Sequence, residues 1–175
     1  MIQNKSIFGE LNSIPHWYAL HTRYRYETKV HNLLSERKII NYLPLNTEFH
    51  KWSDRYKKVH LPLFSCYIFV FLTLRDRSKV LQINGVINFV SFNGIPATIP
   101  ENQIATIKQI LEVKQKVSQA DYFTPGKTVR VIQGPLKGIE GTLVAKNKKT
   151  KLIIKVDSLK KAISVEIDYR DLMII

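Results

Sequence analysis

The chain has 175 residues, of which 45% are hydrophobic and 23% are charged, a composition typical of a folded globular protein and not of a disordered one. Lysine and arginine number 27 against 14 acidic residues, and the net charge of +13 favours a polyanionic partner such as nucleic acid. No apolar run approaches the roughly 20 residues of a membrane span, no signal peptide is recognisable, and the single cysteine excludes an internal disulfide. We therefore expect a cytoplasmic protein with no membrane partner.

Strands and helices are mixed over the first two thirds of the chain. Aromatic and β-branched residues mark the strands, whereas Val30, Leu33 and Leu34 repeat at helical spacing. Pro44 indicates an edge or irregular strand, and Pro100 suits the start of a helix. In chain order we predict a strand at 17–24, a helix at 26–39, an extended segment at 41–49, a basic hairpin tip at 50–60, a strand at 61–71, a short helix at 75–83, a strand at 85–94 that ends at an Asn-Gly turn, and an amphipathic helix at 99–116.

After residue 116 the pattern changes. The segment 117–125 has few large apolar residues and is predicted to be a linker. Beyond it come five short β-like runs, GKTVRVIQG, GTLVAKN, KLIIKVD, AISVEIDY and DLMII, with turn signals and no helical stretch between them. This spacing indicates a small five-stranded barrel of SH3 type. We therefore predict an α+β protein with a first domain over residues 1–116, a linker over 117–125 and a barrel domain over 126–175.

A catalytic function has little support in the sequence. An enzyme of this size needs a nucleophile or an acid–base pair within a pocket. Cys66 lies in the apolar stretch LPLFSCYIFVF (61–71), where a thiol is usually inert. No histidine lies at a spacing from Cys66 that would support a catalytic Cys–His pair. The sequence has neither an HExxH nor a CxxC arrangement and no glycine-rich phosphate loop after a strand. We therefore expect a protein that is not an enzyme and that holds no metal or other cofactor.

Several segments resemble one known family. GKTVRVIQGPLKGIEGTLV (126–144) resembles a KOW motif, which occurs in ribosomal proteins and in NusG-type transcription elongation factors. WYALHTRYRYETKV, PLFSCYIFV and GVINFVSFNGIPATIP resemble, in the same order, the signature segments of the NusG amino-terminal domain, so the resemblance covers about residues 16–175. The form PLFxxYxFV is more similar to the specialised RfaH and UpxY antiterminators than to housekeeping NusG. The resemblance implies an amino-terminal domain with a mixed sheet and flanking helices, linked to a KOW barrel.

The resemblance also implies binding to RNA polymerase during elongation. In the family, an apolar concavity of the amino-terminal domain packs onto the clamp helices of the polymerase β′ subunit. The residues that match the positions lining this concavity are Phe64, Tyr67, Phe69, Tyr18 and Leu20. The alternative is that all five are ordinary core residues, and strand alternation gives Phe64 the opposite parity to Tyr67 and Phe69. Many relatives have Pro-Gly or Pro-Asn where this chain has Ser65-Cys66, so the turn before the strand is expected to differ.

Nucleic acid is the second partner that the resemblance implies. Two clusters combine cations that hold phosphates with aromatic rings that stack on unpaired bases. The first cluster matches the region that reads the non-template DNA strand in specialised relatives, and it consists of Arg23, Tyr24, Arg25, Tyr26 and Lys29. The second cluster is on the predicted hairpin tip, where it would guide upstream DNA, and it consists of Lys51, Arg55, Lys57 and Lys58, with Trp52 and Tyr56 among them. The alternative for both clusters is a solvated charged surface.

The KOW loop contains two apolar residues, Leu136 and Ile139, on either side of Gly138. In the family this loop is an apolar contact for the termination factor Rho or for a small-subunit ribosomal protein, and the alternative is that both residues belong to the core. We predict a monomeric, two-domain transcription elongation factor that acts as an antiterminator of a specific operon, such as a polysaccharide biosynthesis locus. The competing hypothesis is a KOW-containing ribosome-associated or RNA-binding protein.

Overall fold

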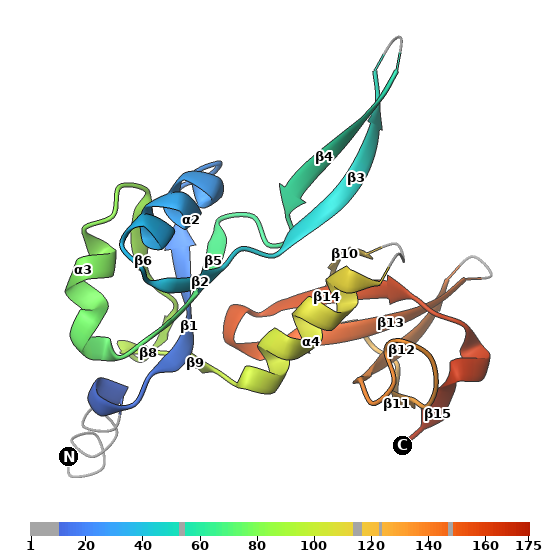
Figure 1. Ribbon diagram of the computed structural model, residues 1–175. Coiled ribbons are helices and arrows are strands. Elements are labelled where there is room, and N and C mark those ends of the chain that lie inside the picture. Colours follow the sequence, from blue (N-terminus) through green and yellow to red (C-terminus); the bar gives the residue numbers. More distant parts are fainter. Residues whose placement is uncertain (1–10, 53–54, 114–116, 123, 147–148) are drawn as a thin grey trace. The chain divides into compact units, whose positions relative to one another are not determined.

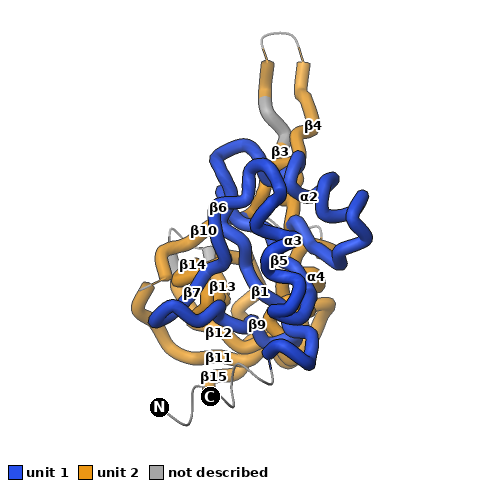
Figure 2. Tube along the Cα trace, turned by 90° about the vertical axis from the view of Figure 1, so that its left-hand side faces the viewer, with its two compact units in different colours: residues 1–43, 64–101 blue, residues 44–63, 102–175 orange. Residues whose placement is uncertain are grey.

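The structure is a computed structural model that describes residues 11–52, 55–113, 117–122, 124–146 and 149–175. Two compact units, drawn in different colours in Figure 2, are each built from two separate stretches of the chain. The first unit comprises Met1–Leu43 and Phe64–Glu101, and the second comprises Pro44–Leu63 and Asn102–Ile175. Strands and helices occur in both units, which confirms the predicted α+β class. No helix in the described part of the chain is long and apolar enough to cross a membrane.

The first unit is built around a five-stranded sheet in the order β2-β5-β1-β6, with β9 also paired to β1. Every pair in this sheet is antiparallel, whereas the family resemblance implied a mixed sheet. Helices α2 (Glu27–Glu36) and α3 (Arg77–Leu81) accompany it, as Figure 1 shows. The strands are β1 (His16–Thr22), β2 (Ile40–Tyr42), β5 (Tyr67–Leu72), β6 (Val86–Phe89) and β9 (Thr98–Ile99), and a 3-10 turn, η1 (Leu74–Asp76), follows β5.

One face of this sheet forms the hydrophobic core of the first unit. Side chains alternate across a strand, so every second residue of β1 and β5 points into the core. Helix α2 contributes Val30 and Leu34, which its helical period brings to one side, and α3 contributes Val80. The buried cluster consists of Leu11, Tyr18, Leu20, Val30, Leu34, Leu43, Ile68, Val70, Leu72, Leu74, Val80, Ile83 and Phe89.

The Asn-Gly turn forms a tight hairpin between β7 (Ser91–Phe92) and β8 (Ile95–Pro96). Asn93 has φ +50° and Gly94 has φ +78°. Positive φ at both central residues is the requirement of a type I′ hairpin turn, which is why Asn-Gly is favoured there. The predicted turn is confirmed, and the segment predicted as one strand over 85–94 is divided between β6 and β7.

The second unit contains a six-stranded antiparallel sheet in the order β10-β14-β13-β12-β11-β15. Strands β11 to β15 follow the five predicted β-like runs. Gly141 suits its place in β12, because a Cβ there would lie 2.5 Å from the carbonyl oxygen of Ile153. The bounds are β10 (Val117–Ala120), β11 (Lys127–Val131), β12 (Glu140–Lys146), β13 (Lys149–Val156), β14 (Lys161–Glu166) and β15 (Leu172–Ile174), with 3-10 turns η2 (Asp157–Leu159) and η3 (Tyr169–Asp171).

A long two-stranded hairpin also belongs to the second unit. Strands β3 (Leu45–Lys51) and β4 (Tyr56–Pro62) pair with each other and form a sheet of their own (Figure 1). The side-chain amide of Asn46 donates to the carbonyl oxygen of Val117 at 3.1 Å. The side-chain amide of Gln119 donates to the carbonyl oxygen of Leu63 at 2.8 Å. These two bonds tie the base of the hairpin to β10.

The compact units differ from the expected division into residues 1–116, 117–125 and 126–175. Nearly all of helix α4 (Glu101–Glu112) and the whole of the β3–β4 hairpin group with the barrel sheet. The segment expected to be a linker begins with β10, which pairs with β14. The polar sequence VSQA of β10 has little intrinsic preference for a strand. Its extended conformation is therefore set by pairing with β14 and not by local propensity.

Candidate functional site

The sheet of the first unit has a second face that is rich in aromatic rings. The register pairs Trp17 with Phe71 and His21 with Tyr67, and the ring centroids lie 5.4 Å apart in both pairs. We call this surface the aromatic face, and it consists of Trp17, His21, Tyr42, Phe64, Tyr67, Phe69 and Phe71. Phe64 and Phe69 are fully buried and Trp17 is nearly so, whereas His21, Tyr42, Tyr67 and Phe71 are half-buried. The sequence prediction brought together only Phe64, Tyr67 and Phe69 of this set.

The turn before β5 explains how Phe64 joins Tyr67 and Phe69 despite its opposite parity. The strand begins at Tyr67, whose N–H donates to the carbonyl oxygen of Phe64 at 3.2 Å and closes a turn over Ser65 and Cys66. Cys66 has φ +68°, the left-handed conformation that Gly or Asn usually supplies at this place in a turn. The Phe64 ring then lies edge-on to Phe69, with 6.1 Å between centroids. Alternation therefore does not extend back to Phe64.

The left-handed conformation of Cys66 gives a stability prediction. Cys66→Asn should hold or raise the urea midpoint of unfolding, since Asn tolerates positive φ. Cys66→Val should lower the free energy of unfolding by about 1–2 kcal/mol, because a β-branched side chain tolerates positive φ less well than Cys does. Ser65→Val, at a neighbouring exposed residue without positive φ, is the matched control and should change stability by less than about 0.5 kcal/mol. Equal losses in all three variants would show that the turn conformation is not the cause.

Tyr18 and Leu20 lie on the opposite face of β1, in the hydrophobic core. Both are completely buried, so they are not available for contact with a partner, and the sequence prediction that grouped them with the aromatic face is corrected. Even positions of β1 face the core and odd positions face outward, which separates Tyr18 and Leu20 from His21. Burial raises the pKa of the Tyr18 hydroxyl to about 12.

The buried Tyr18 hydroxyl has no hydrogen-bond partner among the described residues. Tyr18→Phe should therefore raise the free energy of unfolding by about 1 kcal/mol, because it removes an unsatisfied buried polar group. Because the folded-state pKa is raised, the contribution of Tyr18 to stability is constant below pH 10, and stability is lost as the pH rises from 10 through 12. Denaturant unfolding at pH 7 and pH 11 should show a smaller alkaline loss in the variant. A lower stability of Tyr18→Phe at pH 7 would contradict this account.

The first cationic cluster lies between β1 and α2, and we call residues 23–26 with Lys29 the basic loop. Tyr24 is 65% exposed, and the Arg25 guanidinium lies 5.2 Å from its ring. Arg23, Arg25 and Lys29 are exposed. Tyr26 is half-buried against the core with Lys29 5.4 Å from its ring, so Tyr24 is the ring that is open to stacking.

The backbone of the basic loop is held by close contacts within the first unit. The N–H of Arg23 donates to the carbonyl oxygen of Gly85 at 2.9 Å, and the N–H of Tyr26 donates to Arg23 at 3.1 Å. Gly85 has φ +102°, and a Cβ on it would lie 2.6 Å from Cδ1 of Tyr26. The loop is therefore a preformed cationic and aromatic surface, which suits a single-stranded nucleic acid.

The second cluster lies on the β3–β4 hairpin. Trp52 and Tyr56 are exposed, and the Lys57 ammonium lies 5.6 Å from the Trp52 ring. The N–H of Trp52 donates to the carbonyl oxygen of Arg55 at 2.8 Å, which closes the hairpin around its tip; residues 53–54 lie outside the described part of the chain. Four exposed cations share this ribbon: Lys51, Arg55, Lys57 and Lys58. The structure places them together, as the sequence predicted.

The KOW loop is less open than the sequence suggested. Leu136 is 1% exposed and Ile139 is 6% exposed, so neither residue presents an apolar surface to a partner, and this prediction is corrected. Helix α4 stands close to the loop, and the Gln109 amide donates to the carbonyl oxygen of Pro135 at 2.8 Å. Ile139 and Ile107 line the same cleft between the helix and the barrel. The buried side of α4 therefore faces Ile139 across this cleft.

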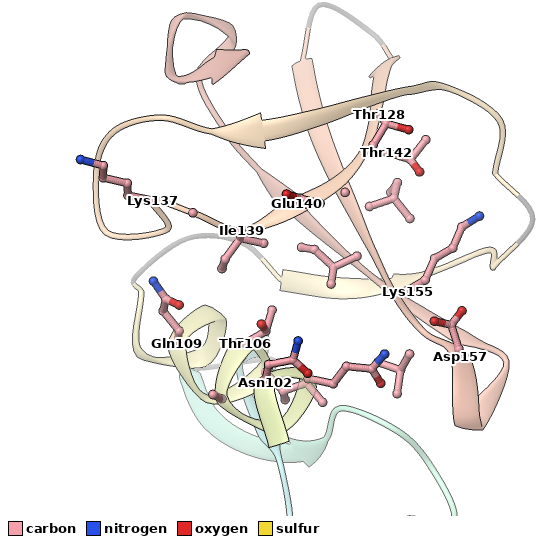
Figure 3. A pocket seen from close by; sticks show the side chains of 18 residues that line it. Asn102, Thr106, Gln109, Thr128, Lys137, Ile139, Glu140, Thr142, Lys155 and Asp157 are labelled. Atoms are coloured by element: carbon pink, nitrogen blue, oxygen red, sulfur yellow. The ribbon is translucent and has the colours of Figure 1, made fainter. Parts of the chain in front are cut away.

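The cleft between α4 and the barrel has a volume of about 940 Å³ and is shown in Figure 3. Asn102, Thr106 and Gln109 lie on the helix side, and Thr128 and Thr142 lie on the barrel side. Two cations and two carboxylates also line it, so it has no net charge to select an anion: Lys137, Lys155, Glu140 and Asp157. Within the described ranges, no group of three His, Cys, Asp or Glu side chains is placed to hold a metal ion.

Sequence reasoning missed Trp17, His21, Tyr42 and Phe71 of the aromatic face. The signal was present in their alternation, because odd positions of both β1 and β5 are aromatic or histidine apart from Ala19. It also missed a buried carboxylate, Glu27, whose Oε1 accepts a hydrogen bond from the backbone N–H of Cys66 at 2.7 Å. No pattern in the sequence links residues so far apart.

The family of the chain follows from its similarity to known proteins. A family model described as NusG, transcription termination factor nusG, matches residues 15–108, more than half of the chain. A structure described as domain interaction in Thermotoga maritima NusG matches at a TM-score of 0.57 and 18% identity, covering 92% of this chain and 97% of that chain. A chain of an MjSpt4:Spt5 complex, conformation A, matches at 0.32 and 14% identity, covering 91% and 97%. No curated protein matches this sequence.

The two structural matches differ in weight. At 18% identity the Thermotoga maritima protein shows a shared fold alone, and the likeness to the Spt4:Spt5 chain is too weak to bear on the fold. The family match rests on residues 15–108, which contain the whole five-stranded sheet, the aromatic face and the basic loop. The chain therefore belongs to the NusG family of transcription factors.

Proposed function

We propose that this chain is a transcription elongation factor that binds RNA polymerase through the aromatic face. The observation that carries the proposal is a sheet with two apolar sides, one packed as the core and the other bearing half-buried rings such as Tyr67, Tyr42 and Phe71. Aromatic rings supply large contact area at low entropic cost and often dominate protein interfaces. The clamp helices of the polymerase β′ subunit are the proposed partner surface.

Phe64 and Phe69 have a supporting role in this proposal. Both are completely buried and lie edge-to-face with each other, so neither offers surface to a partner. Tyr42 stacks on Phe69 with 6.3 Å between centroids, so Phe69 fixes the orientation of a neighbour that is only half-buried. Tyr67, held against His21, is the member of the original set with accessible surface.

DNA is the second proposed partner. The basic loop would hold the non-template strand, with Tyr24 stacked on a base and Arg23 and Arg25 on phosphates. The hairpin cations would hold upstream duplex DNA. For the KOW loop, Rho or a small-subunit ribosomal protein stays the proposed partner, with contact through exposed residues such as Ile132 and Lys137.

The proposed mechanism is conformational and involves no catalysis or cofactor. A monomer in the cytoplasm that binds the closed clamp better than the open one shifts polymerase toward its processive state. Pausing and termination then become less frequent. We further propose that the chain resembles RfaH and UpxY in acting as an antiterminator on a specific operon, such as a polysaccharide biosynthesis locus.

The proposal is tested with the purified full chain and core RNA polymerase. Co-elution of the two proteins and longer transcripts across a terminator in single-round transcription are the expected results. A chain that fails to bind polymerase but is retained on structured RNA would contradict the proposal and favour a ribosome-associated protein. Binding with more termination would keep the polymerase partner and overturn antitermination.

A further inference from the structure

One buried charge has no part in the function proposed so far. Glu27 is the first residue of α2 and is 4% exposed, which is unusual for a carboxylate. A buried carboxylate is costly unless hydrogen bonds compensate it. Glu27 Oε1 accepts from the backbone N–H of Cys66 at 2.7 Å. The partner residue therefore lies in the turn that seats the aromatic face, far from Glu27 in the sequence.

The same turn residue is bonded from the other side. The N–H of Thr22, the last residue of β1, donates to the carbonyl oxygen of Cys66 at 2.8 Å. Thr22 and Glu27 are the two residues that bracket positions 23–26 of the basic loop. Both ends of the loop are thus hydrogen-bonded to one residue, whose N–H and carbonyl group are both engaged.

Cys66 in turn controls two members of the aromatic face. Its left-handed conformation brings Phe64 onto Phe69, and Tyr67 is the next residue along the chain. Tyr67 lies against His21, which immediately precedes Thr22. A displacement of either end of the basic loop would move the turn, and a displacement of the turn would move the Tyr67–His21 pair. The contacts form a closed path from the loop to the face.

We propose that Glu27 is a positioning residue that couples nucleic-acid binding at the basic loop to the polymerase-docking surface around Tyr67. The inference rests on the proposed function and adds how its two surfaces communicate. Phosphates bound by Arg23, Arg25 and Lys29 displace the loop, and the Glu27–Cys66 bond passes that displacement to the turn. Because coupling between sites is reciprocal, each partner should raise the affinity for the other by about fivefold or more.

The test uses NMR signals of the His21 imidazole in the full chain, assigned with a His21→Asn variant. The probe is a single-stranded DNA oligonucleotide of about twelve nucleotides, within the usual site sizes. In the wild type, saturation with the oligonucleotide should shift the His21 signals, because the facing Tyr67 ring moves. Glu27→Gln keeps an oxygen acceptor for the Cys66 N–H and should keep the shift. Glu27→Asp keeps the charge but shortens the reach, and its shift should fall to less than about a fifth while DNA still binds.

The possible outcomes distinguish a failure of the coupling through Glu27 from a failure of the proposed DNA binding. Oligonucleotide binding without a His21 shift in the wild type would overturn the coupling and leave DNA binding intact. Full shifts in both Glu27→Asp and Glu27→Gln would show that the Glu27–Cys66 bond carries no coupling. A wild type that binds no oligonucleotide would overturn both the coupling and the proposed DNA contact. Loss of the shift in Glu27→Gln, with retention in Glu27→Asp, would assign the effect to charge and overturn the bond as its carrier.

Discussion

Tyr67→Ala should weaken the binding of core RNA polymerase by about thirtyfold, which corresponds to roughly 2 kcal/mol, the size of an interface hot spot. Tyr67 is half-buried on the aromatic face, and its ring lies 5.4 Å from His21. In the free protein the Tyr67 ring is already held in place by His21 of the neighbouring strand. Binding therefore costs little side-chain entropy at Tyr67, and truncation loses the contact without recovering such a cost. The measurement is a titration of labelled protein with core polymerase.

The matched control is Tyr169→Ala. Tyr169 is 60% exposed in the second unit, and its truncation should leave polymerase affinity unchanged. Phe69→Ala is not a suitable test, because removing a fully buried ring costs about 3–5 kcal/mol of stability and would unfold the sheet. Equal affinity of folded Tyr67→Ala and the wild type would remove the aromatic face as the docking surface.

Removal of two cations from the basic loop should have the second large effect. Arg23→Ala/Arg25→Ala should weaken binding to single-stranded DNA about tenfold or more at 50 mM salt. The variant would neutralise fewer phosphates, so its binding would release fewer counterions from the DNA. The slope of log affinity against log salt should fall in magnitude by about 1.4, at roughly 0.7 per phosphate for a single strand. Fluorescence anisotropy at several salt concentrations measures both quantities.

The control for charge alone is Arg75→Ala/Arg77→Ala. These arginines are exposed in the same unit, at η1 and α3, and their loss removes the same net charge. If both double variants lose affinity and salt dependence equally, the DNA responds to the general field of the protein and the basic loop is not a specific site. A loss confined to Arg23 and Arg25 supports the loop.

Much of the fold follows from local patterns. The apolar and aromatic run LPLFSCYIFVF predicted β5, the Asn93-Gly94 pair predicted its hairpin, and the β-branched runs after residue 126 predicted β11 to β15. These features are set by residues close together in the chain, where side-chain period and turn chemistry act directly. The aromatic residues of β5 were recognised for the same reason.

Long-range packing accounts for what the sequence left out. Nothing local indicates that VSQA pairs with β14, or that Leu136 and Ile139 are buried. The choice between core and surface for Tyr18 depends on which face of the sheet α2 and α3 cover, and periodicity is the same for either face. The parity of Phe64 depends on one left-handed residue, Cys66, whose conformation cannot be inferred from its type.

The β3–β4 hairpin has a thermodynamic consequence for the proposed contact with duplex DNA. A two-stranded ribbon outside any larger sheet is only marginally stable in water, because it buries little apolar surface to offset its chain entropy. In the proposed complex, part of the attraction between its cations and DNA would therefore be spent on ordering the ribbon. The proposed contact would then be weak, independent of base sequence and quickly released, as a factor that moves along DNA with polymerase requires.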